Sequence, residues 1–147
     1  MDGISVLRRD LSEELIVRYR LARRVRRRSR DCGDEELHFL ADERRAVLPV
    51  WHSGQLVVYP WGAHHGPLPR EPWCMEEDLK LWQALRPEKV RIVASFCVTK
   101  GVWYPVVEGI EGILARGNVY MLAKPSTHYF RTMTRSQRMP VLISQQI

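Results

Sequence analysis

Glycine and proline divide the chain beyond residue 46 into short apolar runs. The shortness of these runs constrains the fold more than any other feature. The runs read AVLPVWH, QLVVYPW, KVRIVASFCV, VWYPVVEG, IEGILA, NVYMLAK and MPVLIS. They are rich in β-branched and aromatic residues, which favour strands. The dipeptide Ser53-Gly54 between the first two runs favours a hairpin turn. The sequence therefore predicts a fold that consists mainly of short strands.

Two segments favour helices instead. Residues 10–28 contain no glycine or proline, place apolar residues three or four apart, and begin with Asp10 and Glu13, a possible capping box. Residues 75–85, MEEDLKLWQAL, open with acidic side chains and space Leu79, Trp82 and Leu85 to face a core. We expect an α+β fold: one β-rich domain, a curved sheet or partly open barrel, with an arginine-rich N-terminal helix and one short internal helix.

A change of charge and a glycine at residues 31–34 indicate a boundary. The stretch DCGDEE follows the arginine-rich segment directly. We therefore divide the chain into a basic N-terminal helical segment, residues 1–31, and a β-rich domain, residues 32–147.

Arginine dominates the charge of the chain. The 147 residues carry a formal net charge of +6, and most of the arginines of the first segment lie between residues 18 and 30. Guanidinium groups bind phosphate oxygens bidentately, so this block favours contact with a nucleic-acid backbone. A basic block is equally typical of a helix that docks on an acidic protein or mediates self-association. Both interpretations stay open here.

Other residue types give weaker indications. Exposed aromatic side chains on a basic sheet stack unpaired bases, although most tryptophans of a small domain lie in its core. His52, His64 and His65 lack the spacing of a metal site. Cys97 lies in an apolar run and is expected to be buried, whereas Cys32 follows arginines that favour a thiolate and is the one weak nucleophile candidate.

Several classes are disfavoured by what the sequence lacks. It contains no phosphate loop, dinucleotide fingerprint, GxSxG elbow or zinc-protease helix, so we expect no cofactor and no metal. Three cysteines without a CxxC pair favour a reducing, cytoplasmic setting. No apolar run reaches the ~18 residues of a membrane span, and we expect no membrane partner.

Four short stretches follow one another in the order found in a known family. They are YPWG at 59–62, KGVWYPV at 100–106, IEGILA at 110–115 and RMPVLI at 138–143. They resemble the Trp-Gly step, the ADGFYEW-like strand, the AGLW-like strand and the closing IHDRMPVIL segment of SRAP domains, the SOS-response-associated peptidase family. Those domains recognise abasic sites in single-stranded DNA. The resemblance implies that Arg70, Arg135, Arg138 and His128 lie in segments that line a DNA groove.

The same comparison shows what is missing. In that family an N-terminal cysteine, exposed by loss of the initiator methionine, links covalently to the abasic aldehyde with help from Asn, Glu and His. Position two is Asp2 here, Tyr104 lies near the position of the glutamate, and Ser136 takes the position of the histidine. Cys32 would become a terminus only after cleavage that follows Asp31. Without the nucleophile and the acid/base pair we do not expect the family's chemistry.

The sequence thus leads to three hypotheses. The first is a non-catalytic, SRAP-like domain that binds nucleic acid, preferentially single-stranded DNA. The second is a protein-interaction or self-association module, in the latter case a homo-oligomer, that uses the basic N-terminal helix. The third is an active family member that uses Cys32 after processing. For the first hypothesis the expected binding residues are Arg23, Arg24, Arg26, Arg27, Arg28, Arg70, Arg135 and Arg138.

Overall fold

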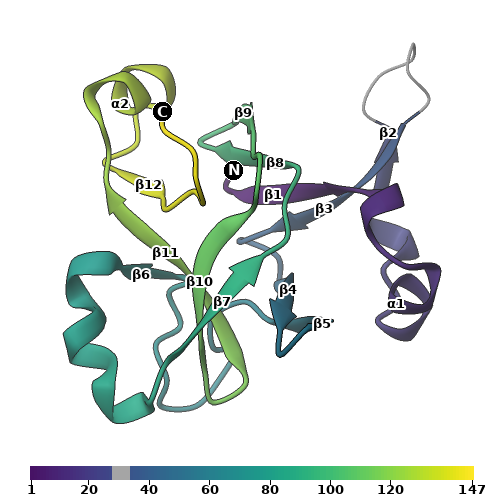
Figure 1. The fold of residues 1–147 in the computed structure, drawn as a ribbon, viewed down its shortest axis with the longest axis horizontal. Helices are drawn as coiled ribbons and strands as arrows, with labels where there is room; N and C mark the ends of the chain where they lie inside the picture. The colour runs from purple at the N-terminus through teal and green to yellow at the C-terminus, as the bar shows by residue number, and fades with distance from the viewer. Residues whose placement is uncertain (28–33) are drawn as a thin grey trace.

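Most of the apolar runs form strands of two mainly antiparallel sheets in the computed structural model, which describes residues 1–27 and 34–147 (Figure 1). The first sheet has five strands in the order β2-β3-β1-β8-β9. The bounds are β1 Gly3–Leu7, β2 Val25–Arg27, β3 Glu35–Leu40, β8 Phe96–Thr99 and β9 Val102–Pro105.

The second sheet has seven strands. Six of them follow the order β12-β11-β10-β7-β4-β5, and β6 pairs in parallel with β11. Their bounds are β4 Val47–His52, β5 Gln55–Pro60, β6 Trp73–Met75, β7 Glu88–Ile92, β10 Ile110–Ala115, β11 Asn118–Pro125 and β12 Arg138–Pro140.

The predicted β-rich α+β class is confirmed, but the strands divide between two sheets, and neither sheet closes into a barrel within the described ranges. The hairpin at Ser53-Gly54 is confirmed too, since β4 and β5 pair from Val47 with Pro60 to His52 with Gln55. Both turn residues have positive φ, 52° and 75°. Such a turn matches the twist of the two strands it joins.

The arginine-rich segment is not the single long helix that its composition predicts. Helix α1 covers only Glu13–Arg18, and its N-cap is Ser12, whose side chain accepts from the Leu15 amide. Arg20 then has φ 55°, which no helix continues through. The buried Leu21 and the pairing of Val25 with Leu37 draw the chain back to the first sheet, so the following arginines lie in a 3₁₀ turn, Ala22–Arg24, and in β2.

Strand β1 links the two parts of the chain that the sequence divided at residue 31. It lies between β3 and β8, pairing Ile4 with Phe39 on one side and with Cys97 on the other. Residues from the first segment therefore share a sheet with residues beyond the boundary, and Figure 1 shows β1 in the middle of that sheet.

The alternation of side chains along the strands places apolar groups on both faces of the seven-stranded sheet. In β11, Val119, Met121 and Ala123 contact the main core, which also contains the inner face of the five-stranded sheet. Tyr120 and Leu122 point the other way, into a smaller cluster that is covered by the 3₁₀ helix η3, Glu76–Leu85. A strand of this kind is buried on both sides.

Helix η3 confirms the predicted apolar face of residues 75–85 but not its α-helical geometry. Leu79, Trp82 and Leu85 recur every third residue, and a 3₁₀ helix has three residues per turn, so all three pack against the second cluster. The Trp82 ring contacts the Tyr120 ring with centroids 4.7 Å apart. No helix among the described residues is long and apolar enough to cross a membrane.

Candidate nucleic-acid interface

Five of the arginines that the sequence singled out are exposed and have no carboxylate within ion-pair distance among the described residues. In the basic segment, within the part of the chain that the structure describes, Arg26 donates to the carbonyl oxygens of Arg23 and Val25 at 3.0 and 2.9 Å. Unpaired guanidinium groups of this kind are available to an anionic ligand. The five are Arg23, Arg26, Arg27, Arg70 and Arg135.

Arg24 belongs to the structure instead. Its side chain is only 7% exposed, donates to both Glu43 carboxylate oxygens at 2.8 and 2.6 Å, and lies over the Phe39 ring. Glu43 in turn accepts from the Leu40 amide. Arg24 therefore fixes the turn that follows β3 and is not available at the surface.

Arg138 occupies an intermediate position. Its guanidinium stacks on the Trp73 ring, 4.6 Å from the centroid, and pairs with Glu71 at 3.3 Å. The side chain remains 35% exposed. It lines a hollow of about 360 Å³ together with Met1, Asp2 and Lys100.

We call this hollow the terminal hollow. It brings together segments that lie far apart in the sequence. Asp2 accepts from the Lys100 amide at 2.7 Å, and the Lys100 ammonium donates to the Arg135 carbonyl at 3.2 Å. Arg138 lines the hollow, whereas Arg135 adjoins it through its backbone carbonyl. Asp2, Asp42 and Glu71 surround the cations, so the charge here is mixed.

The outer face of the five-stranded sheet offers a second surface. Trp103 on β9 is 37% exposed, and its ring lies against that of His38 on β3, with centroids 5.1 Å apart. Arg27, Glu36 and Phe96 complete a hollow of about 320 Å³ around them, the tryptophan hollow. Next to it, and sharing His38, is a smaller hollow of about 210 Å³, lined by Arg23 and Arg26 and by the paired Arg24 and Glu43.

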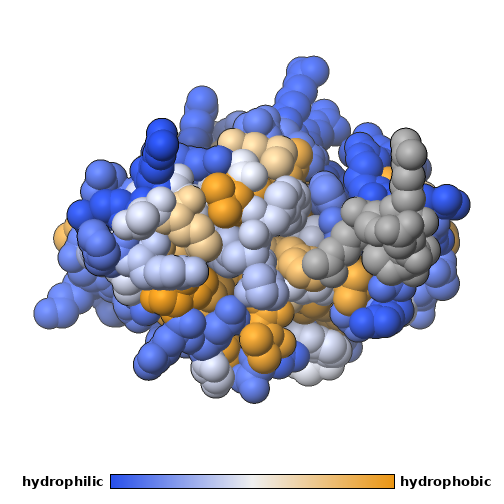
Figure 2. All heavy atoms as spheres, turned by 90° about the horizontal axis from the view of Figure 1, so that it is seen from above, coloured by the Kyte–Doolittle hydropathy of each residue, from blue (hydrophilic) through white to orange (hydrophobic). Residues whose placement is uncertain are grey.

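The hollows follow strand β3. The tryptophan hollow lies at Glu36 and His38, its neighbour at His38 and Leu40, and the terminal hollow at Ala41 and Asp42. Figure 2 looks onto the side that carries α2 (His128–Thr134), β9 and β2 at the top of Figure 1. There, apolar and weakly polar side chains gather in the middle of a hydrophilic rim.

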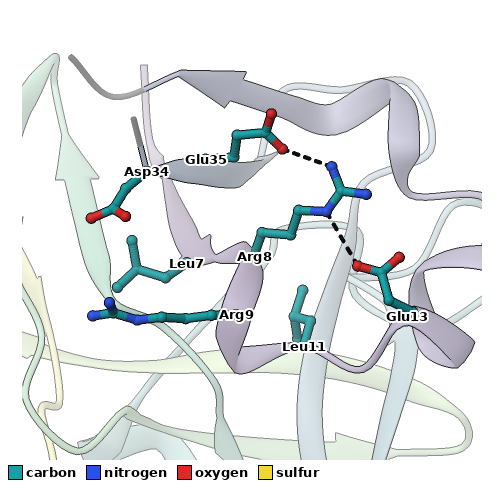
Figure 3. Close-up of a pocket in the computed structure, with 7 residues that line it drawn as sticks. All are labelled: Leu7, Arg8, Arg9, Leu11, Glu13, Asp34 and Glu35. Atoms are coloured by element: carbon teal, nitrogen blue, oxygen red, sulfur yellow. Dashed lines mark hydrogen bonds and ion pairs between the residues drawn. The ribbon is translucent and has the colours of Figure 1, made fainter. Parts of the chain in front are cut away.

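The hollow drawn in Figure 3 has a different character. It measures about 500 Å³ and is lined by Leu7, Leu11, two arginines and three acids. Arg8 bridges Glu35 at 2.7 Å and Glu13 at 3.4 Å, and these two carboxylates raise its pKa above the ordinary value. The Arg8 guanidinium therefore already has two carboxylate partners. Because three acids face two arginines in this hollow, its charge disfavours phosphate.

Cys97 and Tyr104 are buried and hydrogen-bonded to each other. The Tyr104 hydroxyl contacts Thr99 Oγ1 at 2.8 Å and donates to Cys97 Sγ at 3.1 Å. Burial raises the pKa of the Cys97 thiol to about 12 and raises that of Tyr104 as well. The predicted burial of Cys97 is confirmed, and a thiol of this kind is not nucleophilic at neutral pH.

His52 is held by contacts within the fold. Its ring lies 2.9 Å from the Tyr59 hydroxyl and 2.8 Å from Glu88, so both ring nitrogens have partners. Within residues 1–27 and 34–147 no three His, Cys, Asp or Glu side chains are grouped to hold a metal ion. Arg28 and Cys32 lie outside the described residues.

Sequence reasoning missed Glu36 and His38. Both lie on β3 two residues apart, and residues i and i+2 of a strand share a face. The alternation Glu-Leu-His-Phe-Leu from residue 36 carried that signal, because Leu37 and Phe39 point to the core between them.

Comparisons with protein-family models, curated protein sequences and solved structures found no significant match to this chain.

Proposed function

We propose that this protein is a non-catalytic nucleic-acid-binding domain, related in fold to SRAP domains, that holds single-stranded DNA along β3 and the outer face of the five-stranded sheet. The observation that carries the proposal is the position of Arg23, Arg26 and Arg27. They are exposed, have no carboxylate partner among the described residues, and lie at the hollows beside Trp103 and His38.

The combination of unpaired cations with an exposed aromatic ring favours single strands over duplex. Guanidinium groups contact phosphate oxygens, and a tryptophan face stacks on a base that is free of its complement. A paired base keeps its faces inside the duplex and cannot reach Trp103 in the same way. Two further exposed arginines adjoin the terminal hollow in the chain: Arg70 precedes Glu71, which lines it, and the Arg135 carbonyl accepts from Lys100 there.

The hydrogen bonds at the family-like positions favour binding without chemistry. The Ser136 hydroxyl donates to the Arg138 carbonyl at 2.7 Å, Tyr104 belongs to the buried group with Cys97, and Asp2 accepts from the Lys100 amide. Each of these side chains has a structural partner. None of them offers a free base or nucleophile at the terminal hollow.

The test is fluorescence anisotropy with a labelled single-stranded DNA and its duplex, over a salt series from about 50 to 200 mM. The variant replaces Arg23, Arg26 and Arg27 with alanine. We expect the single strand to bind more tightly than the duplex. Each lost phosphate contact lowers the slope of log affinity against log salt by about 0.7, so the variant should lose about 2 from that slope.

A control variant removes the same charge elsewhere: Lys80→Ala and Lys89→Ala with Arg116→Asn, the asparagine suiting the positive φ of 49° at that turn. All three residues are exposed on or beside the seven-stranded sheet. We expect it to keep nearly the full slope. Equal losses in the two variants would contradict a defined surface. Absence of binding at low salt would reject nucleic-acid binding and favour the docking module.

A further inference from the structure

Glu36, which lines the tryptophan hollow, has a buried carboxylate oxygen without a partner among the described residues. Glu36 is 6% exposed, and its Oε1 lies 2.8 Å from His38 Nε2. Its Oε2 is enclosed and has no hydrogen-bond partner among the described residues. A buried oxygen of this kind is costly, because it has lost water and gained nothing in exchange. Glu36 is one of the residues that line the hollow.

The rest of the hollow fits a flat, neutral ring. The Trp103 side chain provides an aromatic face, and the His38 ring is tilted 46° against it. The guanidinium of Arg27, at the same hollow, suits a phosphate joined to such a ring. The volume of about 320 Å³ lies in the range of small-ligand sites.

We infer that the tryptophan hollow is a subsite for one unpaired nucleobase of the strand, and that it prefers guanine. The base stacks on Trp103, donates an N–H to Glu36 Oε2, and leaves its phosphate to Arg27. This inference rests on the proposed nucleic-acid binding and adds a base preference to it. Since Oε2 is enclosed, binding widens the hollow around it.

The hydrogen-bond pattern of the bases explains the preference. A carboxylate only accepts, so the best partner presents adjacent donors, and the Watson–Crick edge of guanine carries an N1–H beside an amino group. Adenine and cytosine offer an amino group next to a ring acceptor. Thymine offers one N–H between two carbonyl oxygens, which the carboxylate repels. The expected order is therefore guanine first and thymine last.

A cationic side chain from another protein would also satisfy Glu36 and stack on Trp103. The positive Arg27 at the hollow and the net charge of +6 oppose it, whereas both attract a phosphate. The observations therefore favour the base over a methylated lysine.

The first experiment compares an oligothymidine with the same strand carrying one central guanosine, by anisotropy at fixed salt. The native protein should bind the guanosine strand about tenfold more tightly. Glu36→Gln should reduce that preference to within about twofold, because the neutral amide loses the two-donor match to guanine and no longer repels the carbonyl oxygens of thymine. Circular dichroism confirms that the variant folds.

The second experiment removes the stacking face. Trp103→Ala should weaken both strands alike, by about fivefold or more, and Trp103→Phe should restore part of the loss. Trp51→Ala is the matched control, because Trp51 is 40% exposed but lies at a different hollow, beside Arg91. It should change neither affinity.

The outcomes separate the two proposals. Equal binding of both strands by the native protein would overturn the guanine subsite and leave the binding function intact. Failure of every strand to bind at low salt would overturn the function, and the subsite with it. Binding of a trimethyllysine peptide that needs both Glu36 and Trp103 would assign the hollow to a cationic partner instead.

Discussion

The two faces of the β8–β9 hairpin differ in whether the polar groups beside them have hydrogen-bond partners. Tyr104 points inward, is 6% exposed, packs against the Phe130 ring and shares its hydroxyl with Thr99 and Cys97. Trp103, its neighbour in the chain, points outward beside a carboxylate with an unmatched oxygen. The inner face thus satisfies its polar groups and stabilises the fold. On the outer face of the five-stranded sheet two buried oxygens, Glu36 Oε2 and Ser5 Oγ, have no partner among the described residues, which is the exception for buried polar groups.

The largest expected difference between the two faces concerns stability. Tyr104→Ala leaves a cavity against Phe130 and removes the partner of Cys97 and Thr99, so the free energy of unfolding should fall by about 3–5 kcal/mol. Trp103→Ala should change it by about 0.5 kcal/mol. Urea denaturation of both variants checks this. Similar losses would mean that the outer face is structural as well.

The arginines of the basic segment allow a second contrast. Arg24→Ala leaves Glu43 without its partner near the core and should lower the free energy of unfolding by about 2–3 kcal/mol. Arg27→Ala should leave stability within about 0.5 kcal/mol and weaken DNA binding. Denaturation and anisotropy on the same two proteins separate the roles. If Arg24→Ala were neutral for stability, the ion pair with Glu43 would not hold the turn after β3.

A smaller effect should appear in alkali. Burial holds the pKa of Cys97 at about 12, above its ordinary 9.0, so between these values the folded state keeps a proton that the unfolded state has lost. Stability is therefore full below pH 9 and falls above it, by up to about 1.4 kcal/mol per pH unit for this group. Cys97→Ser should flatten that decline. An unchanged slope would exclude Cys97 as its source.

Local patterns predicted part of the fold well. The Ser53-Gly54 turn and the three-residue spacing of Leu79, Trp82 and Leu85 each depend on neighbours in the chain. The prediction of a long arginine-rich helix was wrong because Leu21 and Val25 are stabilised more by packing and pairing at the first sheet than by a continued helix. Helix α2 was missed, although Thr127 caps it by accepting from the Phe130 amide.

The site was harder to predict than the strands. Whether an arginine is free or paired depends on carboxylates distant in the sequence: Glu43 for Arg24, and Glu71 for Arg138. The sequence shows where an arginine lies along the chain, but it does not show which carboxylate packs against that arginine in the fold. The aromatic residues were foreseen only as a group, and Trp103 lies on the face of β9 opposite to that of the buried Tyr104, which composition alone does not reveal.

The central position of β1 has a consequence for how the chain folds. Gly3 pairs with Leu40 on one side and with Val98 on the other, and its missing side chain leaves room for the Phe39 carbonyl oxygen, which an alanine methyl would overlap. During synthesis β1 therefore waits for β8 before its second edge is covered. Such long-range pairing slows folding and leaves an open edge to neighbouring nascent chains. Synthesis is slower at lower temperature, so fewer incompletely folded chains are present at the same time. Expression at lower temperature should therefore raise the soluble yield.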